Sequence, residues 1–195
     1  MVTAPGLPSS ALICAGHPRI SWTIWTVVIW CRVIRDVVEV GGQRLVRETI
    51  QHPGAVVIVP VLPGSRLVFV RQYRRAVERY LLELPAGTLD HGERPVSCAR
   101  RELEEETGWQ AGRIKRLGAF YAAPGFFSEQ MTVFLATDLT PVPARPEADE
   151  FLTPVVLPLR TALAKIRSGA ICDAKSIIGV LSAERALKTM RRLKR

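Results

Sequence analysis

The sequence predicts an α+β fold, in which a mixed β-sheet is flanked by helices. Short runs rich in valine, isoleucine, threonine and aromatic residues recur along the chain, separated by glycine and proline turns, as in strands joined by hairpins. Segments with helical periodicity lie in the middle of the chain and at its C-terminal end. With 195 residues, 48% of them hydrophobic and 23% charged, the chain can form one sizeable globular domain and a small appendage.

The N-terminal part is predicted to contain two hairpins. Residues 25–40 and 43–50 flank Gly41-Gly42, and residues 55–62 and 66–73 flank Pro63-Gly64-Ser65. The chain start is rich in proline, glycine and small residues, which is typical of a loose terminus. We therefore expect three parts: a flexible extension at 1–24, a β-hairpin subdomain at 25–52, and a main domain at 53–195.

The remaining elements are predicted from periodicity and capping signals. A short strand at 81–85 leads through a glycine turn into a helix at about 95–107, for which Pro95 suits the first helical position and Gly108 the C-terminal cap. Further strands are expected near 114–122, 130–138 and 152–158, and helices at about 160–167 and 173–192.

The stretch from Gly87 to Trp109 carries the strongest functional signal, because it packs four glutamates into five positions. On a helix, the side chains of Glu102, Glu105 and Glu106 share one face, while Glu104 points nearly the opposite way. Three carboxylates on one rigid face favour a hard divalent cation, Mg²⁺ above all, with Mn²⁺ as the alternative. A solvated acidic helix face is the competing interpretation.

This stretch resembles the Nudix box, G-x5-E-x7-R-E-U-x-E-E-x-G-U, where U is apolar. Every specified position is matched, by Gly87, Glu93, Arg101, Glu102, Leu103, Glu105, Glu106, Gly108 and Trp109. The resemblance implies a Nudix hydrolase with an α/β/α sandwich, which cleaves a nucleoside diphosphate linked to another moiety. It also implies that Glu102, Glu105, Glu106 and the carbonyl of Ala86 are metal ligands, with Glu105 also catalytic. Arg101 and Glu93 resemble the internal ion pair that holds the loop onto the helix.

Segments outside the box resemble the ADP-ribose pyrophosphatase branch of this family. They are residues 82–87, 121–129, 149–151 and 173–175. This resemblance implies AMP and ribose 5-phosphate as products. Other sugar nucleotides, dinucleotides and capped RNA remain alternative substrates, and a non-catalytic ligand-sensing or nucleic-acid-binding module is a further alternative.

The same resemblance suggests residues that contact the substrate. Arg74 is the first candidate for binding phosphate and Arg71 the second, since a guanidinium fork matches phosphate oxygens. The alternative is that these arginines are only surface charge at the end of a strand. Glu83 could hold the ribose or an arginine. Pro124 and Gly125 belong to the segment that the branch uses near its substrate.

The loop at 142–150 is long enough to close over a substrate and carries the candidate catalytic bases. Glu150 is the first candidate and Glu147 the second. The branch often has another acidic residue three positions after the counterpart of Glu150, but here that position is Thr153.

Charge and cysteine usage constrain the partners and the compartment. The net charge is +9, yet much of the excess lies in the arginines before the box and in the C-terminal tail, so nucleic acid is not expected to be the main partner. The apolar segment 20–34 is too short to span a membrane. Four cysteines without a C-x-x-C pair favour a reducing cytoplasm. The branch is usually dimeric, which implies a homodimer.

Overall fold

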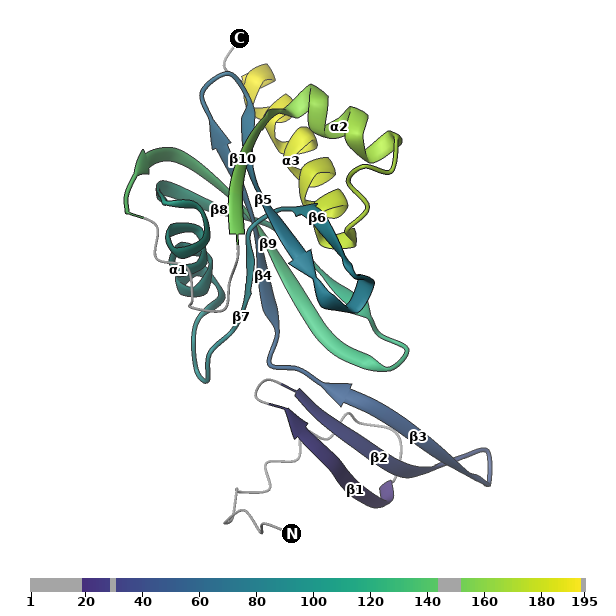
Figure 1. Ribbon diagram of the computed structural model, residues 1–195. Helices are drawn as coiled ribbons and strands as arrows, with labels where there is room; N and C mark the ends of the chain where they lie inside the picture. The colour runs from purple at the N-terminus through teal and green to yellow at the C-terminus, as the bar shows by residue number, and fades with distance from the viewer. Residues whose placement is uncertain (1–18, 29–30, 144–151, 194–195) are drawn as a thin grey trace.

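The computed structural model describes residues 19–28, 31–143 and 152–193 (Figure 1). In chain order its elements are β1 (Arg19–Val28), β2 (Cys31–Val40), β3 (Gln43–Gln51), β4 (Ala55–Leu62), β5 (Arg66–Arg74), the short 3-10 helix η1 (Arg75–Val77), β6 (Arg79–Glu83), β7 (Ala86–Thr88), α1 (Pro95–Thr107), β8 (Trp109–Ala123), β9 (Phe127–Pro141), β10 (Leu152–Pro158), α2 (Leu159–Arg167) and α3 (Ala174–Leu193).

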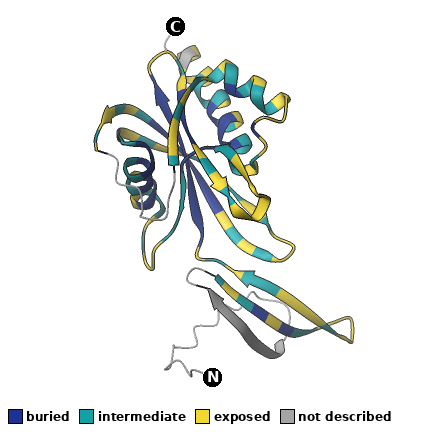
Figure 2. Cartoon of the chain, viewed as in Figure 1, coloured by how far each residue is buried: buried dark blue, intermediate teal, exposed yellow. Residues whose placement is uncertain are grey.

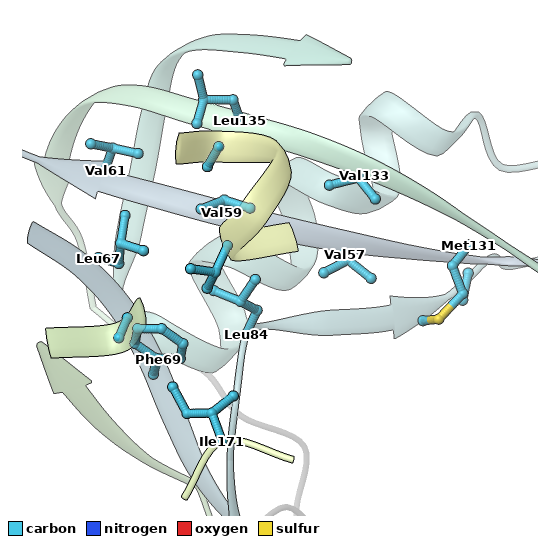
Figure 3. Close-up of a cluster of buried hydrophobic side chains, with 14 residues drawn as sticks. Val57, Val59, Val61, Leu67, Phe69, Leu84, Met131, Val133, Leu135 and Ile171 are labelled. Carbon is cyan, nitrogen blue, oxygen red and sulfur yellow. The ribbon is translucent and has the colours of Figure 1, made fainter. Parts of the chain in front are cut away.

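Strand β4 is the centre of the molecule, and every one of its residues is buried (Figure 2). Because successive side chains of a strand point to opposite faces, its residues divide between two hydrophobic clusters. Val56 and Ile58 pack with buried residues of α1, while Val57 and Val59 pack with α2 and α3 (Figure 3). Helices thus cover both faces of the sheet, and the predicted α/β/α sandwich is confirmed (Figure 1).

The sheet is mixed, as the sequence predicts. The strand order is β1-β2-β3-β9-β4-β5-β10, with β6 paired to β5, β7 to β4 and β8 to β9. Strands β4 and β9 run parallel, whereas β8 and β9 form a long antiparallel hairpin. β4 pairs with β5 only beside their turn, at Val61↔Leu67 and Leu62↔Arg66. Beyond that point β4 pairs with β7 and β5 with β6, so the two strands part and the sheet opens.

Helices α1 and α3 begin and end as their sequences suggest. Pro95 occupies the first turn of α1, and Gly108 closes it in the left-handed region, with φ of 69° and its N–H bonded to the Glu104 carbonyl at 3.0 Å. At the start of α3, the Asp173 carboxylate accepts a hydrogen bond from the Ser176 backbone N–H at 3.0 Å. No helix within the described ranges is long and apolar enough to cross a membrane.

Two predicted elements need correction. The single strand expected at 25–40 is in fact two antiparallel strands, β1 and β2, so that the N-terminal sheet has three strands and starts at Arg19. Folding back lets the backbone groups of this long apolar run pair with each other. The strand expected at 81–85 ends at Glu83, because Pro85 has no N–H for the ladder. The Pro85 carbonyl accepts the Ile58 N–H at 2.9 Å, and β7 follows. Residues 1–18 of the expected flexible extension lie outside the described ranges.

Candidate active site

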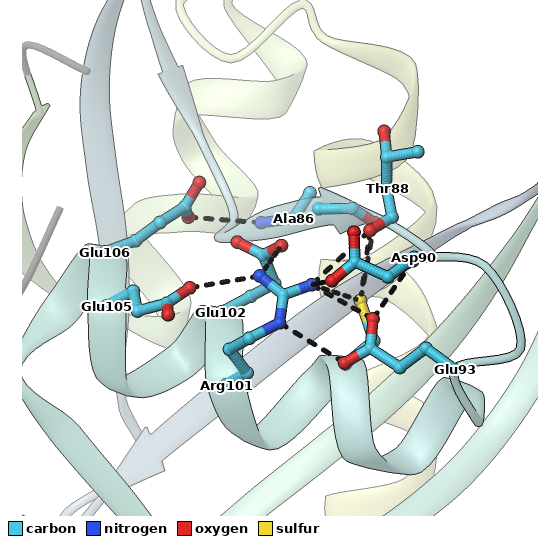
Figure 4. Close-up of polar contacts among 10 residues, drawn as sticks. Ala86, Thr88, Asp90, Glu93, Arg101, Glu102, Glu105 and Glu106 are labelled. Atoms are coloured by element: carbon cyan, nitrogen blue, oxygen red, sulfur yellow. Dashed lines mark hydrogen bonds and ion pairs between the residues drawn. The ribbon is translucent and has the colours of Figure 1, made fainter. Parts of the chain in front are cut away.

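The loop between β7 and α1 is fixed to the helix by one arginine. Arg101 donates from Nε and Nη2 to the two carboxylate oxygens of Glu93, at 3.2 and 3.0 Å, which confirms the predicted ion pair (Figure 4). Glu93 also accepts the Asp90 backbone N–H at 3.1 Å. The hydrogen bonds from Arg101 hold the pKa of Glu93 below its usual range, and their effect exceeds that of burial, which acts in the opposite direction.

The same guanidinium neutralises the acidic face of α1. Its Nη1 donates to Glu102 at 2.7 Å and to Glu105 at 3.0 Å (Figure 4). Arg101 therefore hydrogen-bonds three carboxylates at once, and Asp90 lies 3.9 Å from its Nη2 as a fourth. This arrangement explains how the helix tolerates so dense a run of like charges, which would otherwise repel one another.

Two carboxylates are held against the backbone of β7. The Ala86 N–H donates to Glu106 Oε2 at 3.2 Å. Glu102 lies so close to Gly87 that a Cβ there would be 1.9 Å from the Glu102 carboxyl carbon and Oε1. Glu102 and Glu106 are only 8% and 5% exposed. Glycine at position 87 is therefore required for the acidic face to approach the strand.

These residues suit a hard divalent cation in their chemistry. Glu102, Glu105, Glu106 and the Ala86 carbonyl offer only oxygen donors, which Mg²⁺ and Mn²⁺ prefer. In the part of the chain that the structure describes, no three carboxylate, histidine or cysteine side chains are arranged so as to hold a metal. Arg101 Nη1 instead donates to both Glu102 and Glu105 (Figure 4). Because position 87 has no Cβ, the Glu102 side chain can approach β7 closely.

A cavity of about 600 Å³ opens beside this acidic face, where β4 and β5 part. Its volume is in the range of small-molecule sites. Four of the predicted site residues line it: Arg74, Glu83, Ala86 and Glu102. Apolar lining comes mainly from Phe120, Met131, Val77 and Leu81, and further charged lining from Asp90, Arg101, Glu129, Asp173 and Lys175.

The cavity wall opposite the acidic helix carries a second charged network. Arg74 donates from Nε and Nη2 to the two oxygens of Glu83, at 2.8 and 2.6 Å. Lys175 Nζ donates to Glu83 Oε2 and, at 3.0 Å, to Asp173 Oδ2. Burial raises the pKa of Glu83, but the bonds from Arg74 and the charge of Lys175 outweigh it and hold that pKa below its usual value. Of the two roles expected for Glu83, the structure shows it holding an arginine.

Other predicted site residues lie away from this cavity. The Arg71 guanidinium sits 4.2 Å from the centre of the Tyr80 ring, on an exposed surface. Pro124 and Gly125 lie in the turn between β8 and β9, next to Phe126, whose carbonyl accepts the Ile50 N–H at 2.7 Å. This turn therefore contacts the N-terminal sheet. Glu147 and Glu150 lie outside the described residues.

The structure adds cavity residues that the sequence interpretation did not include. Lys175 and Asp173 begin α3, and Glu129 lies on β9 with its carboxylate 3.9 Å from His52 Nε2. The Asp-Ala-Lys segment at 173–175 contributed to the family resemblance, but only as a motif. The sequence places the start of this helix at 173, and aspartate is a preferred N-cap residue, but neither signal predicts that Lys175 reaches Glu83.

The model of the NUDIX domain family matches residues 51–173. The chain belongs to this family, and the predicted membership is confirmed. The chain is 38% identical over 149 residues to the ADP-ribose pyrophosphatase of Bacillus subtilis (strain 168), covering 75% of this chain and 80% of that protein. It is 41% identical over 153 residues to the ADP-ribose pyrophosphatase of Mycobacterium tuberculosis (strain ATCC 25618 / H37Rv), covering 76% and 73%. A crystal structure of an ADP compounds hydrolase has the same fold, with a TM-score of 0.79 and 26% identity over 89% of this chain and 95% of that one.

Proposed function

We propose that this Nudix hydrolase cleaves the diphosphate bond of ADP-ribose, releasing AMP and ribose 5-phosphate, with Mg²⁺ as its metal and Mn²⁺ as a possible substitute. The observation that carries the proposal is the cavity between two charged walls. One wall presents Glu102 beside Arg101, and the other presents Arg74. A diphosphate needs both a cation-binding carboxylate face and positive charge from the protein. The relatives named ADP-ribose pyrophosphatase support the choice of nucleotide.

The acidic face would hold the metal through Glu102, Glu105, Glu106 and the Ala86 carbonyl. A bound divalent cation neutralises phosphate oxygens and lowers the pKa of a coordinated water. The chain itself positions these ligands: Gly87 gives Glu102 room, the Ala86 N–H fixes Glu106, and Arg101 connects the helix to Glu93.

Proton removal from the attacking water needs a carboxylate base. We assign this role to Glu105 or to Glu150, with Glu147 as the second loop candidate. Glu105 has the advantage of a fixed position, since its Oε2 is held by Arg101 at 3.0 Å. On the substrate side, Arg74 would bind a phosphate oxygen and Arg71 would contribute to the local positive potential, with Pro124 and Gly125 shaping the approach.

We further propose that the protein works as a cytoplasmic homodimer in which the N-terminal subdomain, expected at 25–52 and extended by β1 back to Arg19, reaches the partner, while residues 53–195 form the hydrolase domain. Strands β1 to β3 extend away from the helices (Figure 1), and Val40 and Val46 are 44% and 48% exposed on them. Exposed apolar side chains on a projecting sheet are a suitable contact for a second copy.

Chromatography of reaction products tests the substrate. Purified protein with Mg²⁺ should convert ADP-ribose to AMP, and excess EDTA should stop the reaction. GDP-mannose, a dinucleotide and a capped RNA serve as comparison substrates. Efficient turnover of one of these with ADP-ribose left intact would show that the substrate assignment is wrong while the family assignment stands.

A further inference from the structure

Lys175 occupies an unusual position for a lysine. It lies in the first turn of α3, where the helix dipole does not favour a cation. Its side chain is only 11% exposed, and its Nζ bonds to both Glu83 and Asp173. A buried lysine at a helix N-terminus is costly unless those contacts repay it. Some function of the surrounding site is therefore the expected reason for its presence.

The contacts of Lys175 lead directly to Arg74. Glu83 is 1% exposed and is the residue that both cations share. Arg74 uses Nε and Nη2 for Glu83, and its Nη1 makes no hydrogen bond to any residue that the structure describes. All four charged residues line the cavity, and Arg74, with a side chain 41% exposed against 18% for Asp173 and 11% for Lys175, is the member most open to a ligand.

The four charges of the network balance, with Arg74 and Lys175 against Glu83 and Asp173. Asp173 is itself held by the Ser176 hydroxyl at 2.6 Å and backbone N–H at 3.0 Å, and the same hydroxyl accepts the Leu84 N–H at 2.7 Å. The Glu83 carboxylate is thus attached to the start of α3 through Lys175 and to β5 through Arg74. Without Lys175, its orientation would depend on Arg74 alone.

We propose that Lys175 is a positioning residue for phosphate binding: by fixing the Glu83 carboxylate, it holds the Arg74 guanidinium with its remaining N–H donors available to a substrate phosphate. Because an arginine fork is effective only when its plane is oriented correctly, loss of Lys175 weakens substrate binding through the altered orientation of Arg74. This inference rests on the proposed function, since it assigns a phosphate to Arg74.

Steady-state kinetics with ADP-ribose and Mg²⁺ tests the proposal, first in three single variants. Lys175→Met should raise KM about tenfold, an effect within the range of coupling between contacting residues, and should leave kcat nearly unchanged. Lys175→Arg, which keeps the charge, should stay close to wild type. Lys188→Met is the matched control, because Lys188 lies on the same helix but is 69% exposed and, among the described residues, pairs only with Glu184. It should change neither constant.

The double variant Arg74→Ala/Lys175→Met separates positioning from general structural support. If Lys175 acts through Arg74, the double variant should bind no worse than Arg74→Ala alone. Independent, multiplicative losses, or a fall in kcat with KM unchanged, would overturn the proposal. If Lys175→Met does not fold, Lys175→Gln, whose amide still donates a hydrogen bond, replaces it in the same cycle. Should wild type leave ADP-ribose intact, the proposed function fails, and the cycle is run on whichever comparison substrate is hydrolysed.

Discussion

Replacing Gly87 by alanine is the most direct test of how the acidic face is placed. A Cβ at this position would lie 1.9 Å from both the carboxyl carbon and Oε1 of Glu102, and 2.4 Å from its Cγ. Ordinary van der Waals contact begins at 3.4 Å. The Glu102 carboxylate must therefore move by about 1.5 Å, a displacement that places it away from β7.

The consequences for activity and stability differ. Misplacement of a reacting or ligating group by about 1 Å costs roughly 100-fold in rate, so kcat of Gly87→Ala should fall at least about 100-fold. The fold should survive, because the clashing atoms are the end of a flexible side chain. The backbone of Gly87 is also not in the left-handed region, so alanine introduces no strain.

Turnover of ADP-ribose and thermal unfolding, measured on the same preparations, give the comparison. Gly118→Ala is the control: Gly118 lies in a strand, a Cβ there would meet nothing within 4 Å, and its φ also permits alanine. It should keep full activity. A Gly87→Ala variant that is as active as wild type would refute the idea that close approach of Glu102 to β7 is needed for catalysis.

Three further predictions concern α1 and the loop that precedes it. Glu106→Gln should lower kcat by orders of magnitude while the melting temperature hardly changes, because the amide oxygen can still accept the Ala86 N–H but no longer carries the charge of a metal ligand. Glu93 has a folded-state pKa below its ordinary value of 4.5, so the ionised carboxylate stabilises the fold fully above that pH and loses this effect as pH falls through the folded-state pKa. Glu93→Gln should therefore lower the free energy of unfolding at neutral pH and make that free energy fall less steeply in acid. Urea unfolding between neutral pH and pH 3 measures both effects. Leu103→Ala should cost about 2–5 kcal/mol in the free energy of unfolding, because the side chain is fully buried against β4; a cost near zero would mean that α1 does not depend on this cluster.

Local signals in the sequence were sufficient for most elements of the fold. Gly41 and Gly42 both have positive φ, as a tight hairpin requires, and Pro95 and Gly108 mark the two ends of α1. The fold-back between β1 and β2 was missed because Ile29 and Trp30, between the two strands, are not turn-forming residue types. A run rich in β-branched residues, with no glycine or proline turn in it, therefore predicts one long strand.

The two walls of the cavity differ in how far they could be predicted. The acidic wall is local: Arg101, Glu102 and Glu105 lie within one turn of helix, so spacing alone places them on neighbouring positions. The other wall depends on tertiary structure. Lys175 and Glu83 are 92 residues apart in sequence, and only the packing of α3 beside β6 brings them together. No sequence pattern specifies a contact of that range.

The alternation of side chains along β4 gives the enzyme a degree of modularity. Val56 and Ile58 support the helix that carries the acidic face, whereas Val57 and Val59 support the layer that carries α3 and its charged network. A substitution on one side of this strand changes the packing of one layer and leaves the other in place. The side of the cavity that carries the acidic face and the side that carries Lys175 can therefore be altered by separate substitutions in the two core clusters.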